Sequence, residues 1–80
     1  MSEYNGYKNY ATYNIALHIK NDPVIRMAAI WANDYVQFCE LMRHDFGYVE
    51  TPDQVAYNDT SLDVKNLSEL IEDTKADNED

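Results

Sequence analysis

Residues 22–47 read DPVIRMAAIWANDYVQFCELMRHDFG, and this is the clearest helical stretch of the chain. Asp22 can cap free amide groups, and Pro23 suits the first helical turn. Gly47 suits a left-handed cap at the other end. The apolar residues form two adjacent stripes, Val24, Ala28, Trp31, Tyr35, Phe38 and Met42 beside Ile25, Ala29, Ala32, Val36 and Cys39. Two such stripes predict one broadly buried central helix over residues 23–45.

Two further helices are predicted around it. The first runs from about residue 9 or 12 to Lys20, because Tyr13, Ala16 and Leu17 share a face. The short Asn21-Asp22-Pro23 link predicts that this helix and the central one pack as an antiparallel hairpin. The last helix covers about residues 61–75, with Leu62, Val64, Leu67, Leu70 and Ile71 inward. The fold class is therefore all-α, a compact three-helix domain of a helical hairpin plus a C-terminal helix.

Residues 48–57 allow two local structures. Thr51-Pro52-Asp53-Gln54 has the form of a capping box with proline at the first helical position, which favours a short helical turn through Ala56. Alternatively, residues 48–49 and 55–57 pair as short strands about a type I turn. The helical turn is the favoured prediction.

The chain is predicted to be one domain over residues 1–75, followed by an acidic disordered tail at 76–80. Its N-terminal arm carries Tyr4, Tyr7, Tyr10 and Tyr13 at every third position. Gly6 argues against one continuous helix through all four. We expect Tyr10 and Tyr13 in the core, and Tyr4 and Tyr7 at an interface with a partner.

The charge of the chain is segregated. Residues 1–44 hold four acids and four bases, whereas residues 45–80 hold eleven acids and two lysines, which account for the whole net charge of −9. That charge opposes direct binding to nucleic acid or to an anionic membrane. It is suited to a basic partner. The acids predicted to form the binding surface lie in the loop and on the outer face of the last helix; they are Asp53, Asp59, Asp63, Glu69, Glu72 and Asp73.

The residues offer little chemistry for catalysis. Cys39 lies in an apolar helical run and is expected to be a buried thiol, and a single cysteine points to the reducing cytoplasm. His18 and His44 lack metal-ligand spacing to each other or to Cys39. Residues 53–63 contain several side chains with oxygen atoms that could bind calcium, but these lack the spacing of a calcium-binding loop. We therefore expect no enzyme activity, no metal and no cofactor.

The polar start of the chain and the lack of a long apolar run predict neither a signal peptide nor a membrane span.

One resemblance concerns the run from Asn9 to Asp22, which reads NYATYNIALHIKND. It resembles the opening signature of a small domain of phage and plasmid proteins, in which Asn, an aromatic residue, Thr, an aromatic residue and Asn precede an apolar helix. Residues 51–57 and 61–64 resemble the second block of that family, where Gly is common at the position of Gln54. The family is functionally uncharacterised, so the resemblance implies a mobile-element origin without an activity.

Two functional hypotheses follow. The leading one is a stoichiometric inhibitor of a host defence complex, of the anti-CRISPR or anti-restriction type, whose acids mimic DNA phosphates in a basic nucleic-acid groove. The alternative is a non-enzymatic helical adaptor that binds a host protein through Tyr4, Tyr7 and neighbouring apolar surface, with the acids serving solubility.

Overall fold

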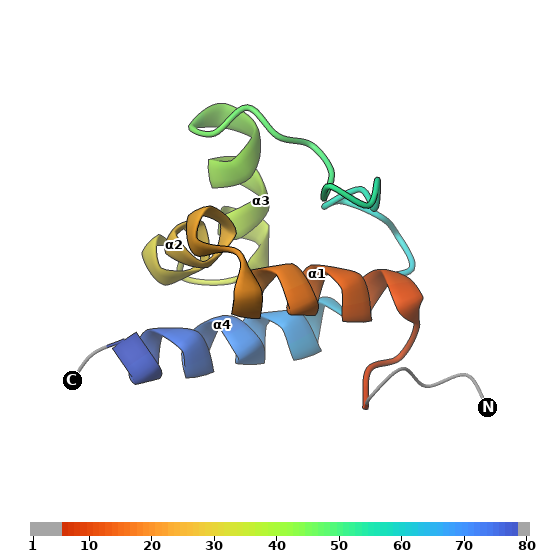
Figure 1. Cartoon of the computed structure of the whole chain (residues 1–80). Helices are drawn as coiled ribbons and strands as arrows, with labels where there is room; N and C mark the ends of the chain where they lie inside the picture. Colours follow the sequence, from red (N-terminus) through yellow and green to blue (C-terminus); the bar gives the residue numbers. More distant parts are fainter. Residues whose placement is uncertain (1–5, 79–80) are drawn as a thin grey trace.

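The computed structural model of the chain describes residues 6–78 and contains four helices (Figure 1). They are α1 (Tyr10–Asn21), α2 (Pro23–Trp31), α3 (Tyr35–His44) and α4 (Val64–Asn78). The described residues form no extended strand, and Glu50 and Ala56 pair in an isolated antiparallel bridge. The predicted all-α class is confirmed. No helix in the described part of the chain is long and apolar enough to span a bilayer.

Helix α2 lies at the centre of the arrangement, since it packs against α1, α3 and α4. Figure 1 shows α1 and α4 side by side, with their N-terminal ends at the same end of the molecule. In the same view α2 is seen largely end-on, so α1 and α2 cross instead of running antiparallel. The predicted hairpin is therefore not formed, although the turn between the two helices is as expected: Asp22 Oδ1 accepts from the amides of Val24 and Ile25 at 2.9 and 3.2 Å.

The predicted central helix over residues 23–45 is wrong, because the helix is interrupted between Trp31 and Tyr35. Ala32 adopts an extended conformation and ends α2. Asp34 then caps α3 by accepting from the Gln37 amide at 2.9 Å, while Gln37 Oε1 accepts from the Asn33 amide at 2.7 Å. This reciprocal capping satisfies free amides at the start of a new helix. The domain therefore has four helices instead of three.

The core collects apolar residues from all four helices. Its largest fully buried side chains include Phe38 and Met42 of α3, Ile15 and Ile19 of α1, and Leu67 and Ile71 of α4. Phe38 lies between two tyrosines, with ring centroids 5.4 Å from Tyr35 and 5.6 Å from Tyr57. The break between α2 and α3 changes which predicted core residues reach this centre. Val24, Trp31 and Val36 were predicted to be buried and are exposed, as are Tyr10 and Val64, the first residue of α4.

Residues 48–57 form the hairpin that was the less favoured alternative, and the predicted helical turn is wrong. The Thr51 amide donates to Val55 O at 2.9 Å, and the Tyr57 amide donates to Val49 O at 3.0 Å. The Gln54 amide closes the turn on Thr51 O at 2.8 Å. Thr51 does not cap a helix because its side chain is buried and donates to Asn14. Tertiary contact with α1 thus overrides the local capping signal.

Gln54 adopts a left-handed conformation, with φ of +71°. This is the position at which a three-residue hairpin loop normally carries glycine, because a Cβ is strained there. We predict that Gln54→Gly raises the free energy of unfolding by about 0.5–1 kcal/mol, the relief of strain exceeding the added entropy of the unfolded chain. Urea denaturation would measure it. Gln54→Ala keeps the strain and should give no gain; an equal gain in both variants would contradict the explanation.

Helix α4 starts later and ends later than predicted. Asp63 caps it by accepting from the Asn66 amide at 3.2 Å, so the first helical residue is Val64 instead of Ser61. Ser61 lies in a turn fixed by Asp59. The helix continues to Asn78, past its predicted end at Lys75, whose Nζ donates to Ala32 O at 2.9 Å. Part of the predicted tail is therefore helical, and residues 79–80 lie outside the described part of the chain.

Candidate interaction surfaces

The three predicted loop acids are held by hydrogen bonds within the domain. Asp53 Oδ2 accepts from Asn14 Nδ2 at 2.7 Å and lies 3.1 Å from His18 Nε2, and these contacts, first that of Asn14, lower the pKa of Asp53. Asp59 accepts from the amide and hydroxyl of Ser61, which lowers its pKa as well. Asp63 caps α4. These acids each have a structural role, and Figure 1 shows the loop of Asp53 and helix α4 on opposite sides of α1.

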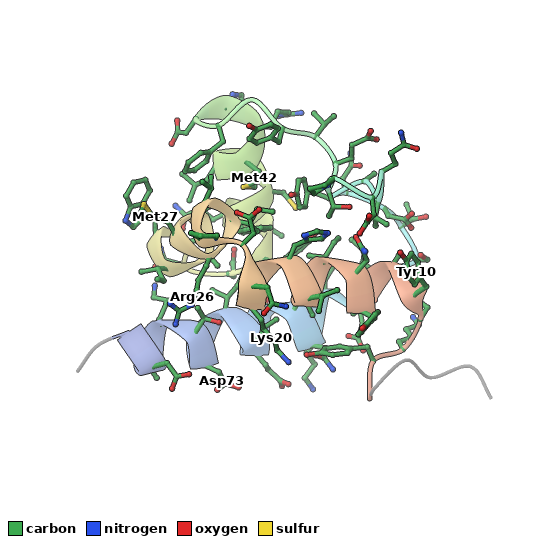
Figure 2. All side chains as sticks on the ribbon, viewed as in Figure 1. Tyr10, Lys20, Arg26, Met27, Met42 and Asp73 are labelled. Atoms are coloured by element: carbon green, nitrogen blue, oxygen red, sulfur yellow. The ribbon has the colours of Figure 1, made fainter. Side chains whose placement is uncertain are left out.

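The three predicted acids of α4 are exposed, and two of them share a surface hollow with basic residues. Glu69 and Asp73 line a hollow of about 450 Å³ that is also lined by Lys20 of α1 and Arg26 of α2. Figure 2 shows Lys20, Arg26 and Asp73 on the same part of the molecule. Asp77 lines the hollow as well, and the two bases offset part of the field of the three acids. The predicted acids therefore do not form one uninterrupted acidic row, and Glu72 is the member that does not line this hollow.

The tyrosines predicted to bind a partner are placed differently from each other. Tyr7 is half-buried and packs against the core, with its ring centroid 6.3 Å from that of Tyr13 and 5.5 Å from Lys20 Nζ. It therefore closes over α1. Tyr4 lies outside the described residues.

The polar residues Asn9, Thr12 and Asn14 tie α1 to the rest of the chain. Asn9 caps α1 by accepting from the Thr12 amide at 2.9 Å, and its Nδ2 donates to Ser61 O at 2.7 Å. Buried Thr12 Oγ1 accepts from the Asp63 amide at 3.1 Å. Buried Asn14 holds the hairpin, since its Oδ1 accepts from Thr51 Oγ1 at 2.8 Å and its Nδ2 donates to Asp53. Asn9, Thr12 and Asn14, which belong to the stretch that carried the resemblance, therefore make hydrogen bonds that hold the fold together.

The most exposed apolar feature of α2 is its outer face, which sequence analysis missed because it assigned Val24 and Trp31 to the core and gave Met27 no place. Val24, Met27 and Trp31 lie on one side of the helix and are 47%, 48% and 58% exposed. The Trp31 ring stacks on the half-buried Phe46 ring, with centroids 6.2 Å apart. Arg26 is the only charged residue of α2. We call Val24, Met27, Trp31 and Phe46 the α2 apolar surface; Figure 2 shows Met27 pointing away from the other helices.

Contiguous exposed apolar residues of this kind mark interaction sites in soluble proteins, and Trp and Met are enriched in them. The signal that could have located them is the Asn33-Asp34-x-x-Gln37 cap, since a helix break after Trp31 leaves α2 too short to bury both stripes.

Comparison with family profiles gives a match, whereas comparison with individual proteins does not. No curated protein and no solved structure matches the chain. A family profile, described as a family of unknown function, DUF7249, matches residues 1–79. The match spans all four helices, the hairpin and the α2 apolar surface. The architecture described above is therefore that of a family domain, and the chain belongs to DUF7249.

Proposed function

We propose that this protein is a non-enzymatic binding domain that attaches to a basic partner protein through the α2 apolar surface. The observation that carries the proposal is the apolar outer face of α2, with Trp31 stacked on Phe46. Tryptophan is among the residue types most often found as interface hot spots, and the stacking of Trp31 on Phe46 supports its side chain on the surface. The resemblance of residues 9–22 to a phage and plasmid domain supports a host protein as the partner.

Charge supports the choice of a basic partner over a second copy of the chain. At a net charge of −9 two copies repel each other at long range, whereas a cationic surface is attracted. The two features then have separate roles. The acids of residues 45–80 accelerate encounter, and the apolar surface slows dissociation.

The test compares two variants against a partner captured from host lysate with the immobilised full chain. We predict that Trp31→Ala weakens the affinity by at least about 30-fold, mostly through faster dissociation, because it removes the central anchor. A triple variant, Glu69→Gln, Glu72→Gln and Asp73→Asn, should change the association rate and its salt dependence with little effect on dissociation. Surface plasmon resonance with the purified partner at several salt concentrations measures both rates.

Two results would contradict this proposal. If Trp31→Ala binds as well as the parent chain while the triple variant does not bind, the acids are the contact surface. If analytical ultracentrifugation shows that the parent chain self-associates and that Trp31→Ala abolishes this, the α2 apolar surface serves a second copy.

The second candidate is the nucleic-acid-mimicking inhibitor, which occupies a basic groove of a host defence complex. The exposure of Glu69, Glu72 and Asp73 on α4 favours it, and the neighbouring Lys20 and Arg26 weigh against it. Binding to such a groove would be displaced by duplex DNA or RNA and would weaken steeply with added salt. The apolar surface predicts that binding persists in the presence of nucleic acid.

A further inference from the structure

A groove between α3 and the chain segment 57–64 has no role in the proposed function. It has a volume of about 480 Å³, within the range of ligand and side-chain binding sites. Its walls include Val36 of α3, Val49 of the hairpin and Val64 at the start of α4, all of them exposed. None of its lining residues belongs to the α2 apolar surface.

The floor of the groove is fixed before any ligand arrives. Tyr35 Oη donates to the backbone oxygen of Tyr57 at 2.6 Å, and Cys39 Sγ donates to the same oxygen at 3.1 Å. The Tyr57 ring packs edge-on against Phe38 in the core. Burial raises the pKa of Tyr35, Cys39 and Tyr57, so the floor is uncharged at neutral pH. A preformed floor lowers the ordering cost of binding.

The rim of the groove carries more negative than positive charge. Glu40 and Asp59 contribute carboxylates, and the bonds from Ser61 to Asp59 lower its pKa and keep it ionised. Arg43 is the one base among the lining residues, and its Nη2 lies 3.4 Å from His44 Nε2. With valine walls and an acidic rim, the complementary ligand is apolar with a positive charge beside the apolar group.

We propose that this groove is a second binding site, which takes an apolar segment of a partner polypeptide that carries lysine or arginine next to its apolar side chains. The apolar side chains contact Val36, Val49 and Val64, and the cation meets Glu40 and Asp59. A second copy of this chain is a poor occupant because of its charge of −9. The site goes beyond the proposed function, since a domain with two separate surfaces can join two polypeptides.

The test uses nuclear magnetic resonance on the full chain with two blocked hexapeptides as probes. Both have two central leucines, flanked by lysines in one and by glutamates in the other. We expect the lysine peptide to shift the methyl signals of Val36, Val49 and Val64 at millimolar concentration, and the glutamate peptide to bind at least tenfold more weakly. Glu40→Gln should weaken the lysine peptide several-fold, and Val36→Asp should abolish the apolar contact; both residues are exposed, so the fold is kept.

Trp31→Ala serves as the matched control, because it lies outside the groove and should leave peptide binding unchanged. A negative result for partner binding through Trp31 can therefore be told apart from a negative result for peptide binding in the groove. The inference is overturned if neither peptide shifts the valine signals up to 5 mM, if the two peptides bind equally, or if the shifted signals are those of Met27 and Trp31.

Discussion

Replacement of Phe38 by alanine should lower the free energy of unfolding by about 3–5 kcal/mol, because it removes a fully buried ring from the centre of the core. The ring packs against both Tyr35 and Tyr57, and the Tyr35 ring is held away from the cavity by the hydrogen bond from its Oη to the backbone oxygen of Tyr57. A domain of 80 residues has a stability of about 4–12 kcal/mol, so the loss is from about a quarter of that stability to all of it. Urea denaturation followed by circular dichroism measures the change.

Trp31→Ala is the matched control for this prediction, since both residues are aromatic and both belong to the stripe that sequence analysis placed in the core. Trp31 is more than half exposed, so its loss should cost less than about 1 kcal/mol, mainly its stacking on Phe46. If the two variants were equally unstable, Trp31 would be a core residue. The assignment of the α2 apolar surface would then be wrong.

The contrast between Phe38 and Trp31 shows what periodicity can and cannot predict. The helical pattern of residues 23–45 identified helical structure, the cap at Asp22, the left-handed Gly47 just after the C-cap Asp45, and Phe38 and Met42 as core residues, because these depend on near neighbours in the sequence. Periodicity could not reveal which stripe faces the core after a break. A break at Ala32 rotates and redirects the following helix, so residues in phase before it lose their common direction.

The hairpin and its polar anchor depended on contacts that are distant in the sequence. Thr51 and Asp53 looked like a helix start because the local spacing fits a capping box. Their actual partner is Asn14, separated from Thr51 by 37 residues. The same holds for Thr12 and Asp63, which are 51 residues apart. Such pairs are set by how α1 packs on the rest of the chain, and one sequence contains no signal for that packing. The resemblance drew attention to Asn9, Thr12 and Asn14 without giving their role.

Asn14→Asp should destabilise the protein by about 2–4 kcal/mol at pH 7, through a change of one atom that keeps the shape of the side chain. The new carboxylate can still accept from Thr51 Oγ1. It can no longer donate to Asp53 Oδ2, and it places a second negative charge next to this carboxylate, at a contact that is 2.7 Å long in the parent chain. Position 14 is almost fully buried, so a carboxylate there loses hydration, and this penalty adds to the repulsion from the half-exposed Asp53. Urea denaturation at pH 7 measures the deficit against the parent chain.

The pH dependence of the Asn14→Asp variant distinguishes this electrostatic explanation from a packing defect. Two carboxyl groups in contact raise the pKa of one of them, and that group takes up a proton as pH falls. Once protonated, it can donate across the same contact, so the stability deficit should be present at pH 7 and shrink below about pH 5. Asn33→Asp, at an exposed site before α3, should change stability by less than about 0.5 kcal/mol at either pH. A deficit that stays constant from pH 7 to pH 4 would show that Asn14 acts through its shape alone. A deficit that shrinks shows that the charge at position 14, beside Asp53, causes the loss, and that the neutral amide of Asn14 is what the anchor between α1 and the hairpin requires.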